Sequence, residues 1–198
     1  MNLKFILDMI LEKCKYSIVI APSKDGIEYV DQLKNELYAK VGWYNSRNSK
    51  AHITILEFTA DEDELKEVIA VIKKIASYEN PLLLRFDGVD RYSNGAVFLK
   101  PDEATKDPLI ELMARIQKKL NIKNLYKSKD PHISIGRKLS EENVQMALKM
   151  FADAKLEFIC ENLVLRKFNP ERKQYDKFSD DFKFLGLPPE PNAQQSLF

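Results

Sequence analysis

Residues 131–137 read PHISIGR, and residues 51–58 read AHITILEF. Each stretch holds one of the only two histidines of this 198-residue chain, His132 and His52, within a run of β-branched residues. Such runs are typical of β-strands. In both stretches a hydroxyl-bearing residue follows the histidine two positions later, so the chain carries the same His-x-Ser/Thr pattern twice.

Side chains at positions i and i+2 of a strand point to the same face of the sheet. His52 is therefore expected to project together with Thr54, and His132 together with Ser134. A single histidine in an apolar strand is usually a packing residue. Two matching pairs in matching strands favour a shared chemical role.

The segments around the two motifs follow a similar order in both halves of the chain. Apolar residues at helical spacing predict helices at about 25–40 and 59–80 and after positions 107 and 140. Short apolar runs predict strands at 16–22, 51–58, 81–86, 96–100, 131–137, 155–160, 162–168 and 182–185. Each half then reads helix, motif strand, helix and strand pair. This order predicts an α+β fold of two similar lobes, each an antiparallel sheet with outer helices and with the active-site groove between them.

Several local signals mark the expected ends of these elements. Asp87-Gly88 and Asn94-Gly95 are turn signals between the strands at 81–86 and 96–100. Asp107-Pro108 is typical of an N-cap followed by a first-turn proline, and Ser140 is typical of an N-cap.

Composition limits the class of protein. Hydrophobic residues make up 44% of the chain and charged residues 31%, as in a globular protein, and the net charge is only +1. Binders of arbitrary polyanions usually carry a large basic excess. Cys14 and Cys160 are too few for a disulfide framework or a zinc site, which favours a reducing compartment.

We divide the chain into an amphipathic helix at 1–15, a bilobal domain at 16–187 and a flexible tail at 188–198. The first segment has charged residues within its apolar stretch and no small-residue cleavage site, so it does not read as a secretion signal. No run approaches the ~18 apolar residues of a membrane-spanning helix. We therefore expect a cytoplasmic protein with no membrane contact.

If the two lobes face each other, both motifs line one groove. One imidazole is then able to act as base while the other, protonated, acts as acid. Hydroxyl groups donate hydrogen bonds to phosphate oxygens that gain charge in the transition state. This set is sufficient for in-line displacement at phosphorus. The sequence shows no glycine-rich phosphate loop and no metal-ligand cluster, so we expect neither a cofactor nor a metal.

The two motifs resemble those of the 2H phosphoesterases, especially the 2′-5′ RNA ligase-like branch. The resemblance extends over about residues 16–185 and includes the two-strand segment LLLRFDGVDRYSNGAVFLK between the motifs. It implies a bilobal fold and metal-independent phosphodiester chemistry on nucleotides or RNA ends. It also implies that His52 and His132 form the acid–base pair and that Thr54 and Ser134 bind phosphate oxygens.

Other residues are candidates for substrate binding. Arg137, just after the second motif, is suited to bind a phosphate by paired hydrogen bonds, or else closes the sheet edge as a surface residue. Trp43, Tyr44 and Phe98 are candidates for stacking on a base, although aromatic residues in such runs are more often part of the core.

The sequence thus predicts a metal-independent phosphodiesterase of 2′,3′-cyclic phosphates or 2′-5′ linkages, on RNA ends or small nucleotides, with ligation as the reverse reaction. The alternative is an RNA- or nucleotide-binding module without turnover. The last five residues, Gln194 to Phe198 (QQSLF), resemble the short peptides with which bacterial proteins dock on the replication sliding clamp. They predict a clamp contact through the tail.

Overall fold

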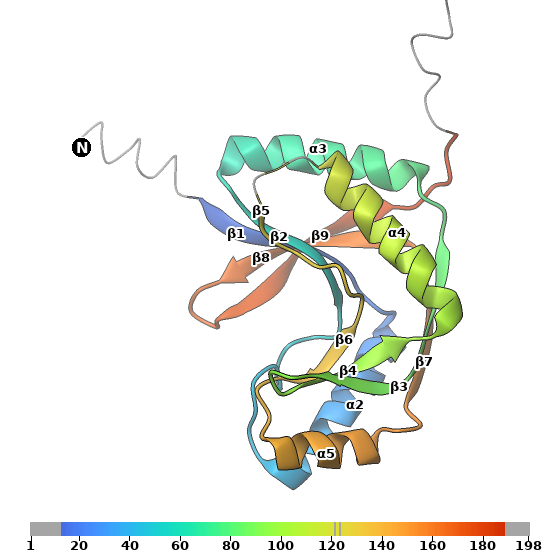
Figure 1. Cartoon of the computed structure of the whole chain (residues 1–198). Coiled ribbons are helices and arrows are strands. Elements are labelled where there is room, and N and C mark those ends of the chain that lie inside the picture. The colour runs from blue at the N-terminus through green and yellow to red at the C-terminus, as the bar shows by residue number, and fades with distance from the viewer. Residues whose placement is uncertain (1–12, 121, 123, 189–198) are drawn as a thin grey trace, which may run out of the picture.

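The computed structural model describes residues 13–120, 122 and 124–188 and contains two antiparallel sheets flanked by helices (Figure 1). The helices of these residues are α2 (Lys24–Val41), α3 (Glu62–Tyr78), α4 (Glu103–Lys119) and α5 (Glu141–Met150). The strands are β1 (Cys14–Ile20), β2 (Ile53–Ala60), β3 (Leu82–Tyr92), β4 (Ala96–Pro101), β5 (Asn124–Lys127), β6 (Ile133–Gly136), β7 (Lys155–Cys160), β8 (Asn162–Asn169) and β9 (Gln174–Lys183). The predicted two-lobed α+β fold is confirmed.

The two sheets exchange strands between the halves of the chain. The first sheet has the order β5-β2-β1-β8-β9, and the second has the order β6-β4-β3-β7. Strand β4 of the first half therefore pairs with β6, which carries the second motif. Strand β8 of the second half pairs with β1, the neighbour of the first motif strand β2. The two halves of the chain therefore do not each build one lobe, because strand partners are set by long-range register that the local pattern does not contain.

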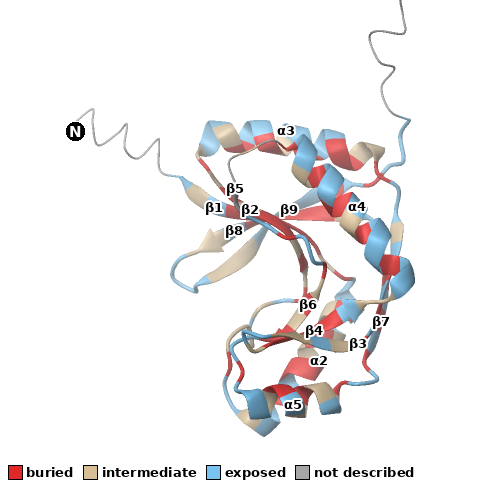
Figure 2. Ribbon diagram, in the orientation of Figure 1, coloured by how far each residue is buried: buried red, intermediate tan, exposed pale blue. Residues whose placement is uncertain are grey.

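The helices lie on the outer sides of the two sheets. Helix α3 packs against β2 and β9 of the first sheet, whereas α2 packs against β6 and β7, and α5 against β3 and β4, of the second. Helix α4 contacts β2 as well as β3 and β4 and so runs beside both lobes, as Figure 1 shows. In Figure 2 the buried residues of these helices face the sheets, which leaves the opposite sides of the sheets to line the space between the lobes.

Capping residues explain where the helices begin. Asp61 and Glu64 form a capping box at the start of α3, and Ser140 caps α5 as predicted. Helix α4 begins earlier than predicted, with Asp102 as its N-cap, and Pro108 lies inside it. The proline is tolerated because it and Ala104, whose carbonyl it leaves without a helical partner, are both exposed to water.

Of the two predicted turns, one is present in the structure and the other is not. Asn94-Gly95 is the turn between β3 and β4, and Gly95 has a φ of 78° in close contact with Leu139. Asp87-Gly88 is not a turn, because β3 continues through it. Gly88, at a φ of 72°, lies at a bulge in the β3–β4 pairing, and its N–H donates to the carbonyl of Ala154 at 2.8 Å.

The ends of the described chain differ in part from the predicted boundaries. Residues 1–12 of the predicted helix at 1–15 lie outside the described residues, and Cys14 and Lys15 already belong to β1, so its boundary at 15 is wrong. Of the predicted strand at 182–185, only residues 182 and 183 are in a strand, as the end of the longer β9. The proposed clamp-binding residues lie outside the described part of the chain. Within that part, no helix has the length and apolar character to cross a membrane.

Candidate active site

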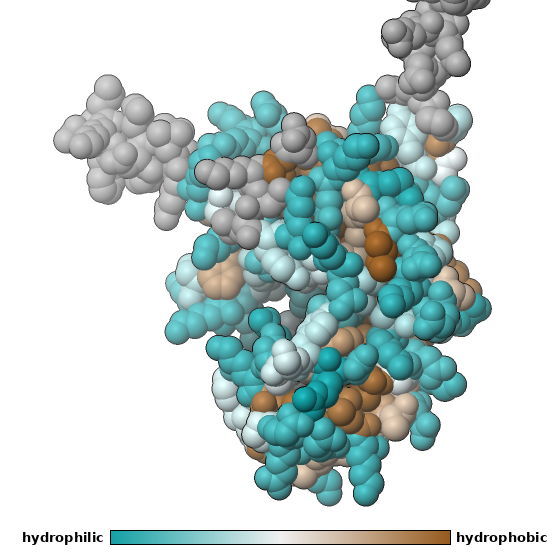
Figure 3. Space-filling model, viewed as in Figure 1, coloured by the Kyte–Doolittle hydropathy of each residue, from teal (hydrophilic) through white to brown (hydrophobic). Residues whose placement is uncertain are grey.

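Both histidines occupy the position immediately before a strand. His52 precedes β2 in the first sheet, and His132 precedes β6 at the edge of the second. Both side chains are partly exposed. Figure 3 shows the surface hollowed between the two lobes.

The two imidazole rings are held in the same way. The Nδ1 atom of His52 lies 2.7 Å from the carbonyl oxygen of Lys50, and that of His132 lies 2.9 Å from the carbonyl oxygen of Asp130. In both cases the carbonyl belongs to the residue two positions earlier. A carbonyl oxygen only accepts hydrogen bonds, so Nδ1 must carry the proton. Nε2 is then the nitrogen that gains or loses a proton in each ring.

The two hydroxyl groups lie on the same faces as the histidines. Thr54 and Ser134 are half-buried, and the isoleucines on either side of each are fully buried. This alternation places the hydroxyls on the groove side of their strands. Thr54 pairs with Val19 of β1, and Ser134 pairs with Phe98 of β4.

The surroundings of His52 favour its neutral form. Burial lowers the pKa of His52 well below its usual range, and the positive charge of Arg166 lowers it further, while the hydrogen bond to Lys50 opposes this shift. Smaller contributions in the lowering direction come from Lys34 and from His132.

His132 has a different set of neighbours. Burial lowers its pKa as well, but the hydrogen bond to the Asp130 carbonyl and the charge of the Asp130 carboxylate both act to raise it, and Arg137 acts to lower it. His132 therefore has a carboxylate beside it, whereas the charged neighbours of His52 are cations.

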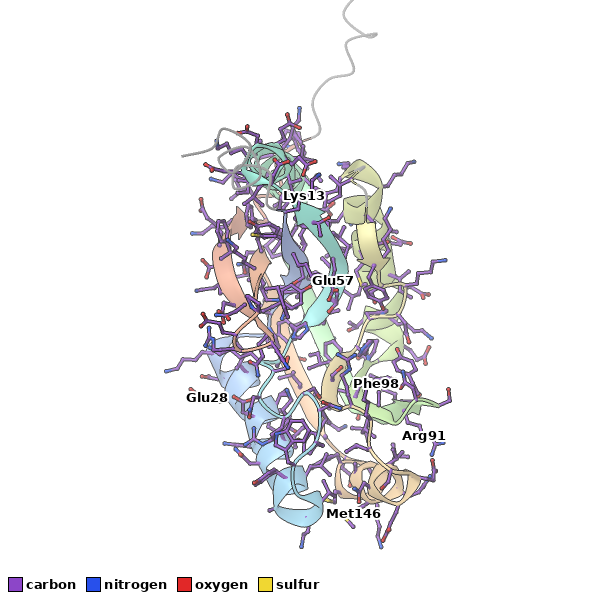
Figure 4. All side chains as sticks on the ribbon, turned by 90° about the vertical axis from the view of Figure 1, so that its left-hand side faces the viewer. Lys13, Glu28, Glu57, Arg91, Phe98 and Met146 are labelled. Atoms are coloured by element: carbon purple, nitrogen blue, oxygen red, sulfur yellow. The ribbon has the colours of Figure 1, made fainter. Side chains whose placement is uncertain are left out.

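Aromatic rings hold His132 in place. The ring centroid of Phe98 is 5.0 Å from that of His132 and 4.4 Å from that of Tyr92, and the hydroxyl of Tyr92 lies 3.2 Å from His132 Nδ1. The same hydroxyl donates to the carboxylate of Asp130. Phe98, labelled in Figure 4, is only 5% exposed and packs against both of these rings. Stacking of a base on Phe98 stays a prediction.

The other three residues predicted to bind substrate differ in how far they are exposed. Tyr44 is buried, and its hydroxyl donates to the carbonyl of Lys34 at 3.0 Å, so the prediction that it stacks on a base is wrong. Trp43 is 70% exposed, and stacking on it stays a prediction. Arg137 is exposed, and its backbone N–H donates to the carbonyl of Asn45 at 3.1 Å.

Two buried cations near His52 were not predicted. Arg166 of β8 donates from Nε to the hydroxyl of Ser17 at 3.0 Å, and Lys34 of α2 donates to the carbonyls of Ser46 and Ser49 in the loop before the first motif. Both residues carry a signal in the sequence, because each places a charge where the local pattern requires an apolar residue. Arg166 ends the apolar run LVL of β8, and Lys34 lies on the buried stripe of α2.

Two further observations concern metal-binding side chains and cavities. In the described part of the chain, no three histidine, cysteine or acidic side chains cluster in a way that would hold a metal ion. A cavity of about 410 Å³ lies at the β8–β9 hairpin, lined by Phe168 and Lys177 among others and by neither histidine.

A sequence model of a known family matches residues 22–172, which is most of the chain, and its description is the 2′-5′ RNA ligase superfamily. The chain belongs to this superfamily. Membership confirms the resemblance to the 2H phosphoesterases and supports a phosphodiesterase-type function.

Solved structures show the same fold at low sequence identity. Escherichia coli LigT in its apo form has a TM-score of 0.63 and 14% identity, over 85% of this chain and 96% of LigT. LigT complexed with 3′-AMP has a TM-score of 0.65 and 15% identity, over 85% and 97%. The TT0787 protein of Thermus thermophilus has a TM-score of 0.60 and 18% identity, over 87% and 98%. The search of curated proteins found no match.

Proposed function

We propose that this protein is a metal-independent phosphodiesterase that opens 2′,3′-cyclic phosphates, or processes 2′-5′ linkages, on RNA ends or small nucleotides. The observation that supports this most directly is the pair of histidines with Nδ1 bound to a backbone carbonyl. Each ring is thereby left with Nε2 as the nitrogen that transfers a proton, one on each lobe.

The reaction with a cyclic phosphate needs one proton to be taken up and one to be given. The Nε2 atom of one histidine removes a proton from water as the water oxygen attacks phosphorus. The bond from phosphorus to one ribose oxygen breaks, and the other histidine gives its Nε2 proton to that oxygen. The products are a phosphomonoester and a free ribose hydroxyl.

The neighbours of the two rings support one division of these roles between His52 and His132. His52 lies among cations and stays neutral, as a base must. His132 lies beside the Asp130 carboxylate, which stabilises the protonated ring that an acid requires. An incoming phosphate anion raises the pKa of both rings, and His132 is the ring that we expect to take up the proton.

The hydroxyls of Thr54 and Ser134 donate hydrogen bonds to the nonbridging phosphate oxygens, where charge increases in the transition state. The exposed guanidinium of Arg137 is positioned near His132 to bind the same anion. If a hydroxyl of a second ribose replaces water as the nucleophile, the same steps open the cyclic phosphate to a phosphodiester, which is ligation. The binding of 3′-AMP by the similarly folded LigT agrees with a nucleotide in this groove.

Turnover of 2′,3′-cyclic mononucleotides in the presence of EDTA tests this proposal. We expect a phosphomonoester product, and phosphorus NMR identifies which ribose oxygen keeps the phosphate. Activity that depends on added divalent metal would contradict the mechanism. Binding of cyclic nucleotides and of RNA ends without any turnover would instead support a nucleotide-binding module.

A further inference from the structure

The groove side of the first sheet extends beyond the catalytic residues. Thr54 pairs with Val19, and two residues further along β1, Ser17 pairs with Glu57 on one side and with Arg166 on the other. Two residues of a strand span about 7 Å, so Arg166 lies in the row of side chains next to that of Thr54.

The side chains of Ser17 and Arg166 face the groove and not helix α3. Ser17 and Arg166 alternate along their strands with Ile18 and Leu165, which belong to the continuous apolar core under α3. The charge of Arg166 acts on His52, so the row begins beside the base of the proposed reaction. In Figure 4, Glu57 marks this row on β2, above Phe98 of the second sheet.

Cations and aromatic rings alternate from this point. The guanidinium carbon of Arg166 lies 5.2 Å from the ring centroid of Tyr175, and the ring of Tyr175 lies 5.3 Å from that of Phe168. The ammonium group of Lys15 lies 5.8 Å from the ring centroid of Phe168. We call Arg166, Tyr175, Phe168 and Lys15 the cation–aromatic row. Both rings are half-buried, and Lys15 is exposed.

Charged neighbours leave the row with a positive excess. Lys177, opposite Arg166 on β9, forms an ion pair with Asp180 at 2.8 Å, and Asp176 is paired with Arg172. Glu57, which pairs with Ser17, is the acidic residue beside the row. Burial raises the pKa of Tyr175 to about 12, and the charge of Glu57 and a hydrogen bond to it act in the same direction. The Tyr175 hydroxyl therefore stays protonated.

We infer that the cation–aromatic row binds the RNA strand next to the scissile phosphate, so that an RNA end several nucleotides long is a better substrate than a free cyclic mononucleotide. Proteins bind single strands by stacking bases on aromatic rings and guanidinium planes while cations contact the backbone. The row offers both kinds of group in alternation. The inference rests on the proposed function and adds the substrate class.

Two substrates compared side by side test the inference. One is cytidine 2′,3′-cyclic phosphate, and the other is a uridine pentanucleotide that ends in a 2′,3′-cyclic phosphate. We expect a higher kcat/KM for the pentanucleotide. In the double variant Lys15→Gln, Phe168→Leu, the ratio of the two kcat/KM values should fall roughly tenfold or more, through the KM of the pentanucleotide, because one stacked base and one phosphate contact are lost.

Matched controls lie on the outer helices α3 and α4. The ammonium group of Lys119 of α4 lies 5.8 Å from the ring centroid of Tyr78 of α3, the same distance as between Lys15 and Phe168. The double variant Lys119→Gln, Tyr78→Leu should leave the ratio unchanged. Equal ratios in the wild type and in the Lys15→Gln, Phe168→Leu variant would overturn the inference while leaving the proposed function intact.

Binding measured by fluorescence anisotropy tests RNA binding by the row separately from the proposed catalytic activity. The probe is a labelled uridine pentanucleotide with a 3′-phosphate end, which contains no cyclic ester to open. Weaker binding by the row variant, and not by the control variant, supports the inference even if no cyclic phosphate is turned over. Unchanged binding would overturn it whatever the activity.

Discussion

Ser128 is bound to Ile55 at the point where the chain crosses from the first sheet to the second. The N–H of Ser128 donates to the carbonyl of Ile55 at 3.0 Å. The side-chain amide of Gln117 in α4 donates to both residues, at 2.8 Å to the carbonyl of Ile55 and at 2.6 Å to that of Ser128. Ile55 follows Thr54, and the hydroxyl of Ser128 donates to the Asp130 carbonyl that holds His132. The two motifs are therefore tied together by hydrogen bonds.

The variant Gln117→Glu removes the donors of this amide while keeping the shape of the side chain. A carboxylate repels both carbonyl oxygens and leaves that of Ser128 without its donor, while the carbonyl of Ile55 keeps the N–H of Ser128; an unpaired carbonyl costs about 1–3 kcal/mol. We expect the melting temperature to fall by several degrees and kcat to fall by about tenfold, because the spacing of the histidines is no longer fixed. The control is Gln145→Glu, at an exposed residue of α5. Wild-type kcat in Gln117→Glu would show that the bridge does not set the spacing.

Alanine at either histidine should lower kcat by about two to four orders of magnitude, the range for loss of a positioned acid or base. The double variant His52→Ala, His132→Ala should lose much less than the product of the two single losses, because the two rings act in one step. Thermal unfolding should show that all three variants stay folded, since both side chains are partly exposed in the groove. An unchanged rate for His132→Ala on every cyclic phosphate tested would exclude the assigned mechanism.

The pH dependence of kcat/KM should lie on the acid side of neutrality. The free enzyme needs His132 protonated, and its pKa is lowered, so the active fraction should rise as the pH falls from about 8 to about 6. At still lower pH, protonation of His52 should reduce the rate, and this limb should lie well below the ordinary histidine range. Initial rates at subsaturating substrate measure the profile. A kcat/KM that rises from about pH 6 to about pH 8 would contradict the assignment.

The lowered pKa of Lys34 predicts that the free energy of unfolding depends on pH. Burial lowers its pKa from the ordinary 10.5 to about 8, with Asp31 opposing and Arg47 assisting the shift. Between these two values the unfolded chain binds a proton that the folded protein does not, so the free energy of unfolding should rise with pH. Relative to Lys34→Met, the wild type should gain on the order of 3 kcal/mol as the pH rises from about 8 to about 10.5.

Urea unfolding of both proteins at matched pH values measures this difference. Groups that titrate in both proteins cancel in the comparison. A difference that is independent of pH would mean that Lys34 keeps its ordinary pKa. Because Lys34 also holds the loop that leads to Lys50 and His52, the Met variant should have a lower kcat as well.

The sequence predicts most helices and strands, because their signals are local. The capped helix α5 and the two motif strands are examples. Other features were outside its reach for physical reasons. The start of α4 depended on whether water could satisfy the carbonyl of Ala104, and the continuity of β3 depended on a bulge at Gly88. The position of Tyr44 depended on the burial of its ring, which its neighbours in sequence do not reveal.

The active site likewise has features that follow from local sequence and features that depend on strand pairing. The pairing of each histidine with a hydroxyl follows from strand alternation, so it was predictable. The contact of Arg166 with Ser17 joins residues that are far apart in the chain, and only the β1–β8 pairing brings them together. The role of Phe98 as a packing partner of His132 likewise depends on the register between β4 and β6.

The exchange of strands between the lobes sets an order of events during synthesis. Tyr16 of β1 pairs with Lys167 of β8, so the second neighbour of β1 leaves the ribosome about 150 residues after β1 itself. At about 5–20 residues per second, this delay is on the order of 10–30 s. During that time one edge of β1 has no partner, and such edges are sites of aggregation. Arg166 also arrives with β8, so the nascent chain holds both histidines well before it holds a complete groove.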